Sequence, residues 1–279
     1  MRRSQSVREP LASRFLFPLT ERSFTYKRYD AWLERLGDRR VVPLVELAAA
    51  ERPALGLRHD IDTRLGSALE LARLEAARGI RATYFVLHSA PYYSHDARFA
   101  DALRRLQDEY GHEVGWHSDL VPAALLHGVD PGAYLRRELD WLRAQGLEIR
   151  GVAAHGSPEA RNLGVHNNYL FAGWDEPQPG FPRTDVEWKL DPAEFGLEYE
   201  AYHLGADLYR SDSRFDARGR RWHPDELDLE LLDSAGRSVV LVHPCHWDAS
   251  PAAKARRLAR KVADRLRAQR PHAAASTGA

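Results

Sequence analysis

The chain has 279 residues, with 40 lysine and arginine side chains against 40 aspartate and glutamate side chains. This balance excludes the strong positive field that draws proteins to nucleic acid or to an anionic membrane, so neither partner is expected. One cysteine cannot form an internal disulfide, and no run of about 18 apolar residues predicts a membrane span. The N-terminus lacks the apolar stretch of a signal peptide, so a cytoplasmic protein is expected.

Apolar runs that predict strands alternate along the chain with segments in which apolar residues recur at helical spacing. After an irregular arm over residues 1–28 and two short helices, the expected strands are, in chain order, 54–62, 80–88, 112–117, 149–156 and 237–244. The helices that separate or follow them are expected at 63–78, 99–110, 131–145 and 251–266. Repeated strand–helix units are typical of a parallel sheet covered by helices, and residues 156–236 are expected to form functional loops that contain shorter strands.

Polar side chains stand at the carboxyl ends of four predicted strands. They are Asp60 with Asp62, His117, His155 and His243. The strands of an α/β barrel end on one face, where ligands bind, so these side chains are expected to converge. A carboxylate with several histidines is a ligand set for a divalent metal such as zinc, and a second carboxylate could serve as a base. Each residue taken alone also fits a structural ion pair or a hydrogen bond.

Five segments, LRHDID, GHEVGWH, GVAAHG, YRSDS and LVHP, resemble in sequence and order the motifs of the polysaccharide deacetylase superfamily, the NodB-homology or carbohydrate esterase family 4 proteins. The pair RHDxD and GHExGxH resembles a bacterial branch of that superfamily. The resemblance implies an α/β protein with one domain, a distorted (β/α)7 barrel over residues 53–270. Residues 1–52 are then an arm and short helices packed on the barrel, and residues 271–279 a disordered tail.

The reaction that this resemblance implies is the metal-dependent removal of an acetyl group from an N-acetylated or O-acetylated sugar or sugar conjugate, with Zn²⁺ as the expected metal. It also implies roles for single residues. Asp60 matches the catalytic base, and His243 matches the histidine that protonates the leaving group. Asp212 lies near the family motif whose carboxylate orients that histidine and tunes its pKa, and Asp62 and His117 match metal ligands.

The second metal histidine of the family lies four residues after the first, and Val121 occupies that position here. His155 is the preferred replacement, because it ends the next predicted strand and is expected to face the same end of the barrel. Asp119 is nearer in sequence, but a helix cap or a loop hydrogen bond is the favoured interpretation of it. The Arg-x-Pro-aromatic segment of the family is replaced by AAHGSP, so His155 is alternatively a substrate contact.

Three further residues are expected to bind substrate. Arg58, beside the base, is also expected to hold Asp60 in its ionised form, because a neighbouring positive charge lowers the pKa of a carboxylate. Trp222 and Trp247 are flanked by polar motif residues and are expected to stack on a sugar ring. The alternative for either tryptophan is that it covers an end of the barrel.

Two other functions stay open at this point. The first is a metal-independent amide hydrolase on the same barrel, for which the missing second histidine leaves room. The second is a catalytically inactive barrel that binds a glycan, and the presence of Asp60, Asp62 and His243 together argues against it. The expected substrate is a nucleotide-linked, lipid-linked or free acetylated sugar, or a small amide, rather than mature cell-wall polymer.

Overall fold

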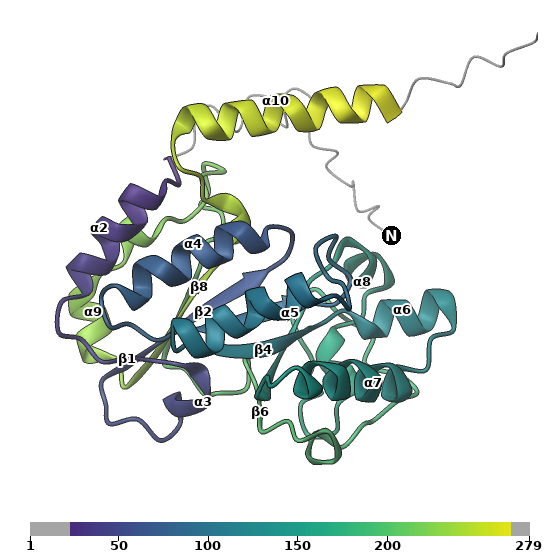
Figure 1. The fold of residues 1–279 in the computed structure, drawn as a ribbon. Helices are drawn as coiled ribbons and strands as arrows, with labels where there is room; N and C mark the ends of the chain where they lie inside the picture. The colour runs from purple at the N-terminus through teal and green to yellow at the C-terminus, as the bar shows by residue number, and fades with distance from the viewer. Residues whose placement is uncertain (1–22, 269–279) are drawn as a thin grey trace, which may run out of the picture.

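Parallel strands form one curled sheet in the computed structural model, which describes residues 23–268 (Figure 1). The strands are β1 (Val41–Val42), β2 (Ala54–Ile61), β3 (Thr83–Leu87), β4 (Glu113–Ser118), β5 (Ile149–Ala154), β6 (Tyr199–Glu200), β7 (Leu208–Ser211) and β8 (Arg237–Val242). Their order is β6-β5-β4-β3-β2-β8-β7, and β1 pairs with the beginning of β2 outside this path. The predicted distorted (β/α)7 barrel is confirmed as a half-barrel, in which no pairing joins β6 to β7 among the described residues.

Helices alternate with the strands along the chain (Figure 1). Several pack against the outside of the sheet, the short helix after the first strand packs on its inner side, and the C-terminal helix extends away from the sheet. The helices are α2 (Tyr26–Leu36), α3 (Leu44–Leu47), α4 (Leu65–Ala76), α5 (Ala97–Arg104) with its π-helical continuation η1 (Arg105–Glu109), α6 (Leu120–His127), α7 (Pro131–Ala144), α8 (Pro158–Leu163), α9 (Leu229–Ser234) and α10 (Pro251–Ala268). Short 3₁₀ helices are η2 (Asn167–Leu170), η3 (Pro192–Phe195), η4 (Pro224–Glu226) and η5 (Pro244–His246). Within residues 23–268, no helix is both long enough and apolar enough to cross a membrane.

The N-terminal segment is more regular than the sequence indicates. Helix α2 begins at Tyr26, inside the predicted arm, because the Thr25 side chain accepts a hydrogen bond from the backbone N–H of Arg28 and caps the helix. Strand β1 also falls in the segment predicted as arm and short helices, yet it belongs to the sheet. The first 22 residues and the predicted tail, residues 271–279, lie outside the described residues.

The core has two parts, one on each side of the sheet. The outer cluster lies between the sheet and the helices and includes Leu57 and Ile61 of β2. The inner cluster fills the half-barrel and includes Phe85 of β3. Every residue of β2 is buried, and successive side chains of a strand point to opposite faces. Arg58 and Asp60 therefore lie on the inner side, where the Arg58 guanidinium is 5.4 Å from the centre of the Phe85 ring.

Two glycines make room for aromatic rings inside the half-barrel. A Cβ atom on Gly115 would lie 2.4 Å from the Phe85 ring, and one on Gly151 would lie 2.2 Å from the Tyr199 ring. Both distances are far below van der Waals contact, so a side chain at either position would displace the ring. With these rings filling the interior, the polar residues of the site lie toward the carboxyl ends of the strands.

Candidate active site

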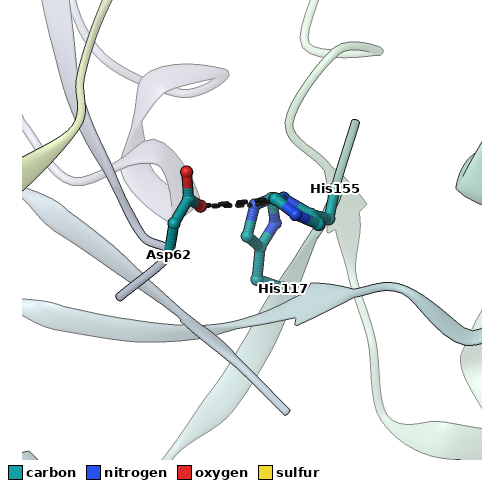
Figure 2. Close-up of side chains that lie close together, drawn as sticks. All are labelled: Asp62, His117 and His155. Carbon is teal, nitrogen blue, oxygen red and sulfur yellow. Dashed lines mark hydrogen bonds and ion pairs between the residues drawn. The ribbon is translucent and has the colours of Figure 1, made fainter. Parts of the chain in front are cut away.

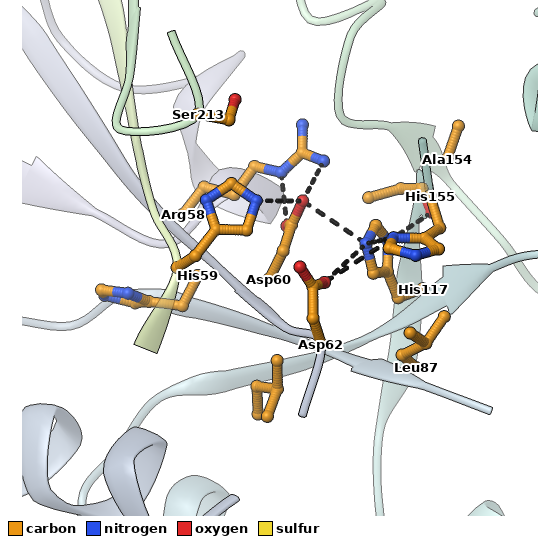
Figure 3. A network of polar contacts seen from close by, with 12 residues as sticks. Arg58, His59, Asp60, Asp62, Leu87, His117, Ala154, His155 and Ser213 are labelled. Atoms are coloured by element: carbon orange, nitrogen blue, oxygen red, sulfur yellow. Dashed lines mark hydrogen bonds and ion pairs between the residues drawn. The ribbon is translucent and has the colours of Figure 1, made fainter. Parts of the chain in front are cut away.

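Side chains from four parts of the sheet meet at its carboxyl end (Figure 3). Asp60 belongs to β2 and Asp62 follows it, His117 belongs to β4, and His155 and His243 follow β5 and β8. The strands run parallel, so their ends reach the same face of the sheet. The five residues that the sequence places at strand ends therefore lie together.

Asp60 is held by a buried arginine. Arg58 donates from Nε to Asp60 Oδ1 and from Nη2 to Oδ2, both at 2.8 Å, and Figure 3 shows the carboxylate between Arg58 and His117. The side chains of Arg58 and Asp60 are 0% and 4% exposed. Burial raises the pKa of Asp60, but Arg58, His117 and His243 together outweigh burial and hold that pKa well below its usual range. Asp60 is therefore an anion at neutral pH.

A triangle of possible metal ligands lies beside Asp60. Asp62 Oδ1 is 3.6 Å from His117 Nε2 and 3.6 Å from His155 Nδ1, and the two nitrogens are 3.1 Å apart. Figure 2 shows the carboxylate and both rings facing one another. A tetrahedral zinc ion with ligands at about 2.0–2.1 Å separates its ligand atoms by roughly 3.3 Å. The three atoms are thus spaced as zinc ligands are.

The surroundings of the triangle also fit a cation. His117 Nδ1 lies 2.9 Å from the carbonyl oxygen of Ala153. That oxygen can only accept, so His117 donates to it and presents Nε2 to the triangle, as metal-binding histidines do. Asp62 Oδ1 is buried and accepts no hydrogen bond from the described residues. A buried carboxylate oxygen without a donor is costly, and a cation bound at the triangle would satisfy it.

The raised pKa of His117 also indicates that the triangle favours a cation. Burial lowers the pKa of His117, but Asp60 and Asp62 raise it by more, so the net shift is upward. The triangle therefore attracts positive charge strongly enough to overcome desolvation. Three protein atoms meet there, and a tetrahedral ion would keep its fourth position for water or substrate, as in catalytic zinc sites.

Asn167 fixes the segment that carries His155. Its Nδ2 donates to the His155 carbonyl oxygen at 2.7 Å and to Asp119 Oδ1 at 3.1 Å, and its Oδ1 accepts from the Val121 N–H at 3.0 Å. Asp119 Oδ1 also accepts from Ser157 at 2.8 Å, so this carboxylate makes loop hydrogen bonds. Val121 is fully buried in the outer core. The residue that joins Asp62 and His117 is thus His155, not Asp119.

A second cluster lies on the other side of Asp60, where Asp212 holds two histidines. His243 Nδ1 is 2.5 Å from Asp212 Oδ1, and His246 Nδ1 is 2.9 Å from Oδ2. The backbone N–H of His243 also donates to Oδ2 at 2.9 Å. These bonds leave His243 Nε2 4.0 Å from Asp60 Oδ2. The backbone N–H of His243 already donates to Asp212, so Asp212 fixes the orientation of His243. Asp212, His243 and His246 also have the spacing of metal ligands.

The charges around His243 keep it protonated. Burial lowers the pKa of His243, but Asp212, with smaller contributions from Asp62 and Asp60, raises it to about 9. Burial raises the pKa of Asp212, but His246 and His243 hold it well below its usual range. For His246 burial prevails, and its pKa lies below the ordinary value for histidine. At neutral pH a cationic His243 therefore stands between two carboxylates.

The structure corrects two of the predicted substrate contacts. Trp247 is fully buried, with its ring 4.9 Å from the rings of Phe24 and Tyr29, so a sugar cannot stack on it. Arg58 is fully buried as well, and its side chain donates hydrogen bonds to Asp60 rather than toward solvent. Trp222 is half-buried and lines a cavity of about 360 Å³, so it stays a candidate.

Two residues of the site were not singled out by the sequence. His246 stands three residues after His243, and Pro244 opens the helix η5 that brings it back to Asp212. Proline at a first helical position followed by a histidine at this spacing was the available signal. No spacing within residues 156–236 singles out Asn167.

Comparison with known proteins finds only distant likenesses. No protein-family model and no curated protein matches the chain. Among solved structures, the catalytic domain of peptidoglycan N-acetylglucosamine deacetylase from Eubacterium rectale is 18% identical over 75% of this chain and 84% of that one, with a TM-score of 0.40. A family 4 carbohydrate esterase from Bacillus anthracis is 14% identical over 95% and 89%, with a TM-score of 0.32. At these identities and TM-scores the likeness does not assign a function, which has to come from the site itself.

Proposed function

We propose that the protein is a metal-dependent hydrolase that removes an acetyl group from an N-acetylated or O-acetylated sugar or sugar conjugate. The observation that carries the proposal is the ligand triangle of Asp62, His117 and His155, with Asp60 beside it and His243 across from Asp60. One carboxylate and two imidazoles favour a divalent metal such as Zn²⁺. The order of the sequence motifs supports the acetylated-sugar class, and a cytoplasmic location stays a prediction.

The protein's own groups are placed for proton transfer. A divalent ion held by the triangle supplies Lewis acidity, which polarises a carbonyl group and acidifies water. Asp60 Oδ2 is 3.5 Å from His117 Nε2, so it borders the triangle and is placed to accept a proton from water there. His243 Nε2, on the other flank, is placed to donate a proton to the departing amine or alkoxide. Because Nδ1 of His243 is bound to Asp212, the transferable proton lies on Nε2.

Alanine at Asp62 or at His155 is expected to remove the metal, because each change deletes one of three protein ligands. Purified, desalted wild-type protein should contain about one zinc or similar ion per chain by plasma mass spectrometry. Asp62→Ala and His155→Ala should contain far less, and their activity on acetylated amino sugars should fall in parallel.

Asp119→Asn is the matched control for this experiment, since Asp119 is the other candidate ligand and lies outside the triangle. It should keep its metal. Wild-type protein that takes up no metal from zinc, cobalt or nickel solutions would contradict the proposal and favour the metal-independent amide hydrolase. A metal-loaded protein with no activity on acetylated sugars would favour the glycan-binding barrel.

The pH dependence of activity tests whether His243 is the proton donor. The pKa of His243 is raised from its ordinary value to about 9, so its cationic form is present at neutral pH and is lost as the pH rises through about 9. We therefore expect kcat/KM to fall on that alkaline limb. In Asp212→Asn the limb should move to lower pH, because the carboxylate that favours the cation is gone. A limb that stays in place would mean that another group is the proton donor.

A further inference from the structure

A cavity of about 360 Å³ lies beside the carboxyl end of β7. Three arginines and three aromatic residues contribute to its lining, namely Arg210, Arg214, Arg220, Tyr209, Phe215 and Trp222. Ser211 is also part of the wall, and the residue that follows it, Asp212, binds His243. The volume lies in the range of small-ligand pockets. The cavity is thus connected to His243 through the end of β7 and Asp212, and it has room for part of a substrate that extends from His243.

The cavity holds more positive charge than its own acids neutralise. Its lining has three arginines against two carboxylates, Asp216 and Glu226. Arg220 is paired with Asp216 at 2.8 Å. The guanidinium of Arg210 donates to a backbone carbonyl at 3.0 Å. Within residues 23–268, neither Arg210 nor Arg214 forms an ion pair, so two guanidinium groups remain for an oxyanion from outside the protein.

The loop that carries these arginines is already ordered by its own hydrogen bonds. The Trp222 N–H donates to the Arg214 carbonyl oxygen at 2.9 Å, which closes the loop at its base. At its turn, Asp216 accepts from two backbone N–H groups at 2.9 and 2.8 Å. Arg221 Nη1 donates to the Asp212 carbonyl oxygen at 2.5 Å. The cavity is thus preformed and tied directly to the residue that orients His243.

We propose that this cavity is a subsite for a phosphate group, so that the substrate is an acetylated amino sugar joined to phosphate. The sugar part of this inference rests on the proposed deacetylase function. Arg210 and Arg214 would bind the phosphate oxygens, and the face of Trp222 would pack on a ring next to it. The Arg221 guanidinium lies 4.6 Å from the centre of the Phe215 ring, so Phe215 serves as a wall of the cavity. A sugar phosphate, a nucleotide-linked sugar and a lipid-diphosphate sugar share this chemistry.

The test measures binding by calorimetry, which stays informative if deacetylation is never observed. The probes are N-acetylglucosamine, N-acetylglucosamine 1-phosphate and UDP-N-acetylglucosamine. The 1-phosphate should bind about 10- to 100-fold more tightly than the neutral sugar. Arg210→Gln and Arg214→Gln should each reduce that advantage. Arg218→Gln, an exposed arginine of the same loop that does not line the cavity, should keep it.

Equal affinity for the neutral and the phosphorylated sugar would overturn the subsite, and so would an equal loss in the Arg218→Gln control, which would indicate general charge attraction. With the advantage present, tighter binding of the UDP-linked sugar than of the 1-phosphate indicates a nucleotide-linked substrate, and equal binding indicates a simpler phosphate. Arginine-dependent binding without deacetylation would retain the subsite and remove the proposed function. Deacetylation together with equal affinity for the neutral and the phosphorylated sugar would retain the proposed function and remove the subsite.

Discussion

Asparagine at position 60 is expected to reduce kcat by roughly 10²–10⁴-fold, the usual contribution of a general base. It should also lower the free energy of unfolding by about 3 kcal/mol or more, because it removes the charge that faces a fully buried arginine. Asp60 accepts both hydrogen bonds of Arg58 at 2.8 Å, and Arg58 is 0% exposed. Turnover of an acetylated amino sugar and urea unfolding should be measured on the same preparation.

A second buried carboxylate separates the two effects of this change. Glu138 on α7 is 1% exposed and binds Tyr93, His95 and Arg137, none of which belongs to the proposed site. Glu138→Gln should therefore cost stability but keep wild-type kcat. An Asp60→Asn protein with wild-type kcat would remove Asp60 from the mechanism. Wild-type stability in the same variant would show that Arg58 finds another acceptor.

Alanine at position 75 is expected to lower the free energy of unfolding by about 3–5 kcal/mol, because it leaves several buried polar groups without their acceptor. Glu75 is fully buried between the sheet and the helices. It pairs with His59 Nε2 at 2.8 Å and accepts hydrogen bonds from Tyr84 at 2.7 Å and from Tyr29. Burial raises the pKa of Glu75, but His59, His112 and Tyr29 together lower it by more, so the group is an anion. Urea denaturation gives the measurement.

Glu70→Ala is the matched control, since it makes the same change on the same helix, α4, at a more exposed position. Glu70 pairs with Arg73 at 2.7 Å, and the two side chains are 34% and 51% exposed. Ion pairs of this kind contribute about 0–1 kcal/mol. If the two variants were equally stable, the buried network around Glu75 would contribute little to folding.

Five strands, β2, β3, β4, β5 and β8, were predictable because they are short apolar runs separated by helical periodicity. The meeting of the strand-end residues followed from the same topology, since parallel strands end on one face. The position of His59 also follows from the alternation of side chains along a strand. It neighbours Asp60 in sequence but lies on the opposite face of β2, where it binds Glu75 rather than the site.

Contacts between segments far apart in the sequence could not be predicted from local sequence patterns. Trp247 is flanked by polar motif residues, but nothing local indicates that its ring packs on Phe24 and Tyr29. His246 approaches Asp212 through a single 3₁₀ turn whose direction depends on the end of β8. Asn167 holds His155 from a loop with no periodicity, so its role emerges only with the three-dimensional structure.

Strand β7 lies at an edge of the sheet and pairs only with β8, over four residues. Strand β2 is flanked by β3 and β8. Detaching an edge strand breaks one ladder of hydrogen bonds, whereas a central strand detaches only as the sheet itself opens. Asp212, which orients the proton donor, is therefore attached to the part of the protein that opens at the lower cost. Asp62 follows the central strand β2, so a local opening at β7 would leave the proposed ligand triangle in place.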